Sequence, residues 1–359
     1  MKVLLVCKLG NSMLTDNILL PLLSSRHTER VFVLRDFAGT LEDDRVEYLV
    51  PAKPSKGLWR HFVKIRRGIR AVRRNRIDVI VGVLNTPHGF IGRIIGLFTR
   101  RPYIHMTVAG HREFWVDGPR MEKLNLRFFG KGPRAVTVTG EQTRQYLLRK
   151  GVPAEKIFIM PNLPDEAFAK VPVDDRQRHY DIISFSRIDR NKNVILLIRA
   201  LTLLKGRYPL KVAIEGDGDQ LEAIKEAARS SGVDTMIDFL GYLPDIEDKI
   251  RLLSDSRIFI SCSKGEGFPV ALLEAMNCGC VPVVSNVGDI ADVVVSGKNG
   301  YLFEDTDDPS GFVACLEKLL SDGESLQAMR AEAIKVKDTI SVAANGKIWD
   351  RVLEYAVKK

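Results

Sequence analysis

Short, almost wholly apolar runs alternate with longer stretches of helical spacing along most of the chain. The runs Val3–Cys7, Ile77–Val83 and Ile258–Cys262 contain few polar residues, which is typical of strands that are buried on both faces. The stretches between such runs repeat apolar residues every three or four positions, as amphipathic helices do. This alternation predicts an α/β fold in which each parallel sheet is covered by helices on both faces.

The same pattern assigns individual elements in two halves of the chain. In the first half we expect strands at 3–7, 31–34, 46–50, 77–83, 103–108, 135–138 and 157–160, and helices at 13–24, 58–76, 88–99 and 140–150. In the second half we expect strands at 181–186, 210–215, 236–240, 258–262 and 281–285, and helices at 192–205, 220–230, 245–254, 270–277, 312–321, 325–337 and 341–356. Thr139 is the predicted cap of the helix over 140–150.

A polar, proline-containing segment over 163–179 separates the two halves. The length of 359 residues is enough for two domains. We therefore expect one domain over 1–165 and a second over 175–338. The helix within 341–359 carries an apolar stripe that should pack back on the first domain, and the stripe consists of Ile348, Trp349, Val352 and Tyr355.

Charge is distributed unevenly between the halves, although the formal net charge is only +9. Residues 1–170 carry 30 Lys and Arg against 15 Asp and Glu, whereas residues 171–359 carry 24 against 30. Halves of opposite sign indicate domains with different partners. The positive half should attract an anionic surface or an anionic substrate.

Much of the positive charge lies in residues 58–76, which include eight Lys or Arg. Phe62, Ile65, Ile69 and Val72 recur at helical spacing in this segment. With Trp59 and Phe62 beside the charges, the segment is typical of a helix that lies on an anionic membrane. The open alternative is a helix that packs on a sheet and has a solvated basic face. No nucleic-acid-binding motif accompanies the patch, so nucleic acid is not an expected partner.

The cysteines indicate a reducing compartment, and the hydropathy predicts no membrane span. Five cysteines are too few and too scattered for a disulfide scaffold. Cys278 and Cys280 lack a second pair for a structural zinc site and are expected in the core. The N-terminal apolar run stops at Lys8, which is too short for a membrane span or a signal peptide. We therefore expect a cytoplasmic protein, peripheral to the inner face of the membrane.

The richest chemistry lies in the segment from Ser261 to Val284. A buried strand leads into a glycine-rich loop around Glu266, and Pro269 fits the first turn of the helix that follows. The amides at that helix start can bind an anion without a charged side chain. Glu266 and Glu274 would both face the crevice beyond the strand ends. From the spacing alone, two solvated carboxylates are an equally good interpretation.

Two further loops follow strands of the second half. Arg187 and Lys192 come after the strand at 181–186, and a guanidinium with an ammonium group is a natural pair for a diphosphate. The alternative is that both are solvated surface residues. Gly216 and Gly218 follow the strand at 210–215, where glycine permits a close approach of the backbone.

Residues 181–320 resemble the retaining glycosyltransferases of group 1 (family 4), which have the GT-B fold of two Rossmann-like domains with an active-site cleft between them. The specific motif is Glu266-Gly-Phe-Pro-x4-Glu274. Weaker motifs occur in the family's order, namely Arg187–Lys192, Gly216-Asp-Gly218, Phe239-Leu-Gly241 and Asn299-Gly300. Residues 133–162 resemble the family's approach to its interdomain linker.

The resemblance implies a role for each residue on the donor side. Arg187 and Lys192 would hold the diphosphate of a UDP- or GDP-sugar, Glu274 would bind the ribose hydroxyls, and Glu266 would lie beside the donor sugar. The other donor-binding positions would be Gly216, Gly241, Tyr242, Gly267, Phe268, Pro269 and Val270, with Gly241 and Tyr242 near the base.

The acceptor side would lie on the first domain. Gly10 and Asn11 stand where the family often has a Gly-Gly loop. His111, past the end of the strand at 103–108, is the expected contact for the donor sugar or the acceptor, because loops at the ends of parallel strands carry function. His105 is mid-strand and expected in the core, and His88 is a third candidate.

The resemblance implies a retaining, metal-independent hexosyltransferase that needs no cofactor. His111, Glu266, Arg187 and Lys192 are its expected catalytic residues, and the two cations would stabilise the departing diphosphate. The basic first half favours a lipid-linked or polysaccharide acceptor, as in cell-surface polysaccharide biosynthesis. The alternatives are a GT-B-like sugar-nucleotide epimerase and a non-catalytic, basic, membrane-binding adaptor. The loop from Lys8 to Met13 lacks the Gly-x-Gly-x-x-Gly pattern of a nicotinamide dehydrogenase.

Overall fold

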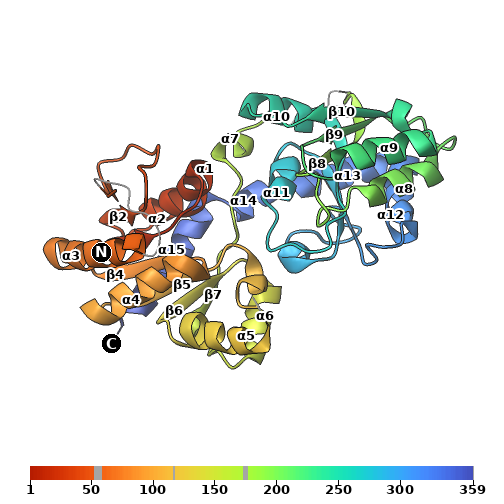
Figure 1. Cartoon of the computed structure of the whole chain (residues 1–359). Coiled ribbons are helices and arrows are strands. Elements are labelled where there is room, and N and C mark those ends of the chain that lie inside the picture. The colour runs from red at the N-terminus through yellow and green to blue at the C-terminus, as the bar shows by residue number, and fades with distance from the viewer. Residues whose placement is uncertain (52–58, 116–117, 173–176, 359) are drawn as a thin grey trace. The chain divides into compact units, whose positions relative to one another are not determined.

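The computed structural model describes residues 1–51, 59–115, 118–172 and 177–358. The chain forms two compact units (Figure 1). Unit 1 comprises Met1–Leu163 together with Ile340–Lys359, and unit 2 comprises Pro164–Thr339. Leu58, the first residue of the predicted basic helix, and residues 173–176 of the predicted linker lie outside the described residues.

Unit 1 is built on a sheet in which every strand is parallel to its neighbours. Its strands are β1 (Lys2–Val6), β2 (Arg30–Leu34), β3 (Val46–Leu49), β4 (Val79–Val83), β5 (Tyr103–Met106), β6 (Ala135–Val138) and β7 (Ile157–Ile159). Their order across the sheet is β3-β2-β1-β4-β5-β6-β7. The strands are apolar on both sides because helices cover both faces, as the sequence predicts.

Alternate residues of β1 show how the two faces are covered. Val3 and Leu5 pack with the helical segment over 11–24 and with the C-terminal helix, whereas Leu4 and Val6 pack with two helices on the opposite face. The helical segments of unit 1 are α1 (Asn11–Leu14), η1 (Thr15–Leu19), α2 (Leu20–Ser24), α3 (Trp59–Asn75), η2 (Asn85–Gly89), α4 (Phe90–Thr99), η3 (Gly110–Glu113), α5 (Pro119–Asn125), η4 (Leu126–Lys131), α6 (Glu141–Arg149), η5 (Ala154–Lys156) and α15 (Val342–Val357).

Unit 2 repeats this architecture with a smaller parallel sheet. Its strands are β8 (Tyr180–Phe185), β9 (Val212–Glu215), β10 (Ile237–Gly241), β11 (Ser256–Ser261), β12 (Val281–Ser285) and β13 (Tyr301–Phe303), in the order β10-β9-β8-β11-β12-β13. Its helical segments are α7 (Glu166–Ala169), α8 (Ile195–Leu204), α9 (Leu221–Ser231), η6 (Asp234–Met236), α10 (Ile246–Ser254), α11 (Val270–Asn277), η7 (Gly288–Asp292), α12 (Ser310–Ser321), α13 (Gly323–Ile334) and α14 (Val336–Thr339). The α/β class with parallel sheets is confirmed.

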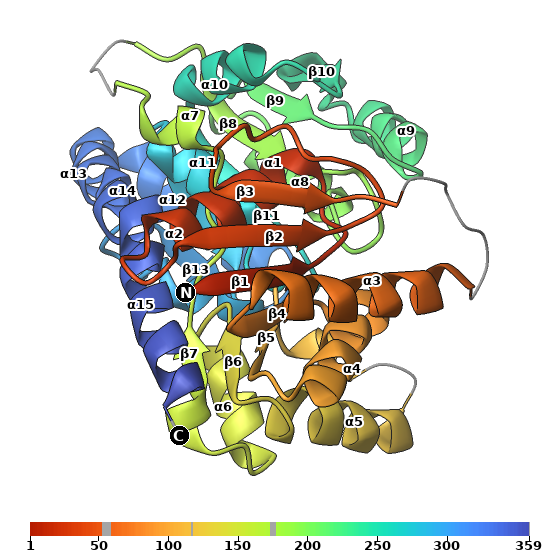
Figure 2. The ribbon, with the colours of Figure 1, turned by 90° about the vertical axis from the view of Figure 1, so that its left-hand side faces the viewer.

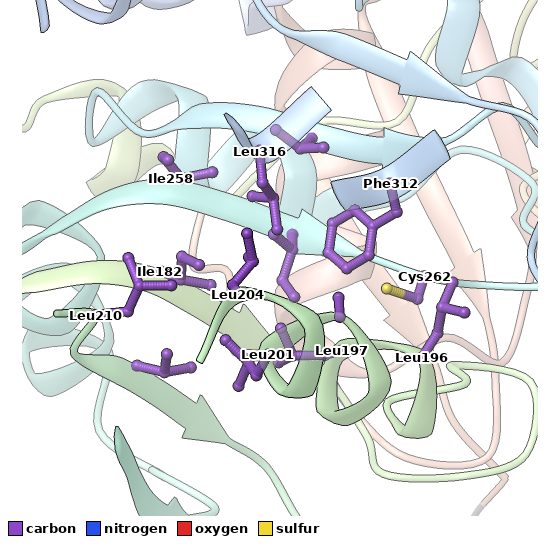
Figure 3. Packing of buried hydrophobic residues seen from close by; sticks show 14 of the residues in the cluster. Ile182, Leu196, Leu197, Leu201, Leu204, Leu210, Ile258, Cys262, Phe312 and Leu316 are labelled. Carbon is purple, nitrogen blue, oxygen red and sulfur yellow. The ribbon is translucent and has the colours of Figure 1, made fainter. Parts of the chain in front are cut away.

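The core of unit 2 joins α8 and α12 to the strands beneath them (Figure 3). Leu197 and Leu201 of α8 are fully buried, as are Phe312 and Leu316 of α12. They pack against Ile258 of β11, one of the strands at the centre of the sheet. This packing fixes β8 and β11 as the rigid supports of the loops that follow them.

Several local features differ from the expectations. Gly140, and not Thr139, is the N-cap residue of α6. The expected helix at 13–24 begins at Asn11 and contains a π-helical turn, η1. The helices α5 and α7 were not expected. The second of these lies within the predicted linker, where the Asp165 side chain accepts a hydrogen bond from the Ala167 N–H.

Among the described helices, none combines the length and apolarity that crossing a bilayer would need. All five cysteines are free and buried. Burial raises the pKa of the Cys278 thiol to about 11 and that of Cys280 to about 12, as expected for thiols in a dry core.

The C-terminal helix α15 packs on unit 1, against α2, β4, β6 and β7 (Figure 2). Trp349 is fully buried among the side chains of β1, β4 and α2. Polar contacts hold the same helix: Asp350 accepts hydrogen bonds from the Ser25 hydroxyl and the Arg26 N–H, and the Asn345 side-chain amide donates to the Pro161 carbonyl. The last residues of the chain therefore complete the core of its first unit.

We expect Trp349→Ala to lower the free energy of unfolding of unit 1 by about 3–5 kcal/mol, because it removes a large side chain from a closed core. Hydrogen exchange followed by mass spectrometry should show lost protection in β1–β7 and little change in β8–β13. Arg351→Ala, at an exposed position of the same helix, is the control. Equal loss of protection in both sheets would contradict the assignment of α15 to unit 1.

Candidate functional site

In unit 2 the strand order reverses between β8 and β11. From β8 the chain builds the sheet in one direction through β9 and β10, and from β11 it builds in the other through β12 and β13. The connecting helices diverge to opposite faces at such a point and leave a crevice at the carboxyl ends of the strands. The loops after β8 and β11 meet at this crevice.

A salt bridge joins the two loops. Lys192 Nζ lies 2.6 Å from Glu266 Oε1, and the two side chains are only 18% and 12% exposed. The backbone joins them as well, because the Lys264 N–H donates to the Asn191 carbonyl at 2.8 Å and the Asn191 side-chain amide donates to the Gly265 carbonyl at 2.9 Å. The structure therefore brings together two of the predicted catalytic residues where these loops contact each other.

Asp189 shapes the loop after β8. One of its carboxylate oxygens accepts hydrogen bonds from the N–H groups of Asn191 and Lys192, at 3.0 and 2.9 Å. The other lies 3.2 Å from Arg187, whose side chain is 79% exposed. The two predicted cations thus differ in exposure. Lys192 is largely buried and pairs with Glu266, whereas the Arg187 side chain extends from the same loop into solvent.

The helix α11 spans Val270–Asn277, as expected, but Pro269 precedes it rather than lying in its first turn. Pro269 is its N-cap, with an extended conformation, and no side chain caps the helix start. The segment around Asp289 holds the loop before α11, because the Asp289 N–H donates to the Gly267 carbonyl at 2.9 Å. A side chain at Gly288 would meet the Glu266 carbonyl at 2.3 Å. The helix start thus presents backbone donors rather than a capping side chain.

Glu274 lies in the second turn of α11 in a different electrostatic setting from Glu266. Burial raises the pKa of the Glu274 carboxyl to about 7, and the charges of Asp165 and Glu215 add to this while Lys249 opposes it. Glu215, at the end of β9, is itself buried and accepts a hydrogen bond from the Leu243 N–H at 3.0 Å. Glu274 is consequently poised to change protonation near neutral pH.

The glycines after β9 and β10 have distinct roles. A side chain at Gly216 would meet the Ser186 carbonyl at 1.9 Å, and one at Gly218 would meet the Ile188 carbonyl at 2.2 Å. Both are needed because the loop after β9 crosses the loop after β8. Gly241 instead faces open space with a φ of +68°, and the next residue, Tyr242, is 63% exposed.

In unit 1 the strand order reverses between β1 and β4. The predicted acceptor residues Gly10 and Asn11 lie in the loop after β1. Arg35 holds that loop, donating to the Asn11 side-chain oxygen at 3.2 Å and to the Leu9 carbonyl at 3.0 Å. Arg35 is fully buried, and sequence reasoning missed it.

The loop after β4 carries His88, which is buried. Burial and the neighbouring Lys64 lower the pKa of His88 to about 4. Lys64 Nζ lies 3.4 Å from the His88 ring and 2.8 Å from an Asp36 oxygen. Lys64 is therefore an interior cation of α3 and not part of its solvated basic face. His105 is buried in β5, as expected, and burial lowers its pKa to about 3.

His111 lies in η3, half-buried, with its ring centroid 5.3 Å from that of Tyr146. Its loop is held by Glu113, whose carboxylate accepts hydrogen bonds from the N–H groups of Val108 and Ala109, both at 2.7 Å. Burial raises the pKa of Glu113 to about 7. Sequence reasoning missed this contact because a lone Glu in a loop carries no signal of where its side chain turns.

Comparison with known proteins places both units in one family. Residues 165–336 match the family model described as glycosyl transferases group 1, and residues 20–163 match that of a glycosyl transferase 4-like domain. Among solved structures, the HepE protein of Anabaena in complex with UDP superposes with a TM-score of 0.77 over 99% of this chain and 100% of that one, at 19% sequence identity.

Curated relatives agree with this placement. One component of the phosphatidylinositol N-acetylglucosaminyltransferase of Arabidopsis thaliana is 27% identical over 52% of this chain and 42% of that protein. A GDP-mannose-dependent phosphatidylinositol monomannoside mannosyltransferase of Mycolicibacterium smegmatis is 27% identical over 66% of each chain. The alignments thus span less than two thirds of either relative. Since the two family models together take in both parallel-sheet units, the chain belongs to the group 1 glycosyltransferases and has their GT-B fold.

Proposed function

We propose that this protein is a retaining glycosyltransferase that moves a hexosyl group from a UDP- or GDP-sugar to a lipid-linked or polysaccharide acceptor. The observation that carries the proposal is the Lys192–Glu266 salt bridge at the strand-order reversal of unit 2, directly before the uncapped start of α11. A cation, a carboxylate and backbone donors at one crevice suit a sugar diphosphate.

The diphosphate would be held by cations and backbone amides. Lys192 supplies a partly buried positive charge, and the exposed Arg187 can turn its planar fork onto phosphate oxygens. The N–H groups of Gly267, Phe268 and Val270 lie at the start of α11, where the helix dipole favours an anion. When the bond from the anomeric carbon to the diphosphate breaks, the electron pair stays on the leaving oxygen and these groups stabilise it. The proposal therefore needs no metal ion or cofactor.

The nucleoside would lie over α11 and the loops after β9 and β10. Glu274, as a carboxylate, would accept hydrogen bonds from the two ribose hydroxyls. Gly216, which has no side chain, would allow the nucleoside to approach the backbone closely. Gly241 and Tyr242 would line the base, because Gly241 leaves open space and Tyr242 is exposed. The UDP complex of the HepE protein and the GDP-mannose dependence of the mycobacterial relative support the two candidate nucleotides.

The acceptor would bind on unit 1 at Gly10, Asn11 and His111. Polyol hydroxyls suit this edge, where Asn11 and the Leu9 carbonyl are already ordered by Arg35. His111 would contact the sugar or the acceptor hydroxyl. The inositol-lipid relatives support a lipid-linked acceptor.

The basic helix α3 would bring the enzyme to the anionic inner face of a membrane, in cell-surface polysaccharide biosynthesis. Its arginines are exposed or half-buried, and Trp59 and Phe62 are 68% and 65% exposed beside them. Interfacial helices combine basic and aromatic residues in this way. The other apolar residues of the predicted stripe, Ile65, Ile69 and Val72, pack on the sheet instead.

Donor screening by thermal shift, followed by product analysis with lipid-linked acceptors, tests the assignment. We expect stabilisation by one nucleotide sugar and transfer of its sugar with retained anomeric configuration. Conversion of the donor to its epimer without an acceptor would instead identify an epimerase. Binding to vesicles with no response to any nucleotide sugar would identify an adaptor.

We expect Lys192→Ala and Glu266→Gln each to abolish transfer while leaving the fold intact. Loss of Lys192 removes a donor aimed at the leaving group, for which about a hundredfold to a thousandfold loss of kcat is typical. Lys264→Ala is the matched control, since Lys264 lies in the Glu266 loop but its side chain pairs with the exposed Asp307. Steady-state kinetics and circular dichroism check both points, and near-normal turnover in either site variant would count against the site.

Donor affinity should rise with pH through the pKa of Glu274. The raised pKa means that the neutral acid is favoured below about pH 7, whereas ribose binding needs the carboxylate. Between pH 6 and pH 8 the affinity for UDP-glucose or GDP-mannose should increase about tenfold, since the ionised fraction does. Calorimetric titration of the wild type and of Glu274→Gln checks this, and the variant should show no such increase.

We expect His111→Ala to reduce transfer strongly while nucleotide affinity stays unchanged, because the donor-binding residues belong to unit 2. Isothermal titration with UDP or GDP and turnover measurements separate the two effects. Weakened nucleotide binding with normal turnover would assign His111 a different role.

A further inference from the structure

A groove of about 690 Å³ runs along α3 on the side that meets the edge strand β3. Leu49 and Ala71 form part of its floor, and the remaining lining is mainly arginine and aromatic. The groove lies in unit 1, apart from the residues proposed above for the donor and the acceptor.

Four arginines line the groove. Within the described parts of the chain, Arg66, Arg67, Arg70 and Arg74 form no ion pair or hydrogen bond with a side chain. The acidic residue of the lining, Glu47, lies 3.6 Å from Arg30 instead. The groove therefore has a positive charge that the protein itself does not neutralise, and this charge is available to an anionic ligand.

Two aromatic side chains stand at one end of the same groove. Trp59 and Phe62 begin α3, line the groove and have ring centroids 6.1 Å apart. Both are about two thirds exposed, at 68% and 65%. Large exposed aromatic residues beside arginine are the pattern of a membrane interface, where an apolar ring meets acyl chains and the cation meets a headgroup.

The lining residues follow helical geometry, so they share one side of α3. Trp59, Phe62, Arg66, Arg70 and Arg74 recur every three or four positions. Lys64, Gly68 and Val72, on the opposite side, are buried against the body of unit 1. Arg60 and Arg73 belong to the same helix but do not line the groove. The helix thus carries arginines of two kinds, which differ in position but not in charge.

We propose that this groove binds the phosphate headgroup of an anionic membrane lipid. The guanidinium groups of Arg66 and Arg70 hold the phosphate oxygens through paired N–H donors, with Arg67 and Arg74 beside them. Trp59 and Phe62 contact the first carbons of the acyl chains. The assignment rests on the proposed attraction of α3 to an anionic membrane. It adds a defined lipid site, whose binding depends on which arginines are present, whereas diffuse attraction depends only on the net charge.

Charge-matched variants separate the two possibilities. Arg66→Gln with Arg70→Gln removes two charges from the groove, and Arg60→Gln with Arg73→Gln removes two charges from the same helix outside it. Glutamine keeps helix propensity, and circular dichroism checks that each variant is folded. Binding is measured by co-sedimentation with phosphatidylcholine vesicles that contain about one third phosphatidylglycerol, with pure phosphatidylcholine vesicles as the neutral reference.

We expect the groove pair to weaken vesicle binding at least about tenfold more than the control pair. Trp59 fluorescence should be quenched by phosphatidylglycerol with brominated acyl chains, and Trp59→Phe should abolish that quenching. Glu47→Gln should tighten binding, because it removes the acidic residue from the lining. Equal losses in both arginine pairs, or the absence of Trp59 quenching, would overturn the groove while leaving the membrane attraction standing.

Two further readouts distinguish failure of this inference from failure of the proposed function. A wild-type protein that binds no anionic vesicle would overturn both the lipid site and the membrane attraction. Calorimetric affinity for UDP or GDP should be unchanged in both arginine pairs, because α3 belongs to unit 1. An altered nucleotide affinity in the groove pair would overturn the assignment of these arginines to lipid.

Discussion

The parallel arrangement of the strands is the constraint on which the rest of the structure depends. Parallel strands end together, so every loop that leaves a carboxyl end emerges at one edge of its sheet. In unit 2 the order reverses between β8 and β11, and the loops after these strands are joined by the Lys192–Glu266 salt bridge. In unit 1 the order reverses between β1 and β4, so the loops of Gly10 and His88 leave the same edge of that sheet. The strand order therefore determines both the fold and the position of the site.

Positive charge in unit 1 is divided between the interior and the surface. Arg35 and Lys64 are buried, and each has polar partners within hydrogen-bond distance, since an uncompensated charge is costly inside a protein. Among the residues that the structure describes, the groove arginines on the outer side of α3 have no acidic partner, and they are exposed or half-buried. One helix therefore contributes a structural cation to the core and an electrostatic surface to the outside, which explains why a segment so rich in charge still forms a well-packed element.

Much of the fold could be predicted from the sequence because buried parallel strands are unusually distinct in composition. The expected strands fall within a few residues of those in both sheets, and the strand expected from Ile258 is β11 (Ser256–Ser261), which leads into the Glu266 loop as expected. Errors occurred at helix starts and in the linker: Gly140 rather than Thr139 is the N-cap of α6, Pro269 precedes α11 rather than lying in its first turn, and the short helix α7 is capped by Asp165. Periodicity locates the body of a helix, but the local geometry of its first residues decides where it starts.

The sequence by itself determined the alternation of strands and helices, the family, the Glu266–Glu274 motif and the basic character of residues 58–76, because these are local properties of spacing and composition. Only the tertiary structure decided that Lys192 pairs with Glu266, that Arg35 and Glu113 support the loops of Asn11 and His111, and that Lys64 is interior while its neighbouring arginines line a groove. Each of these depends on which distant segments the sheet order brings together, and on which residues lose water as a result.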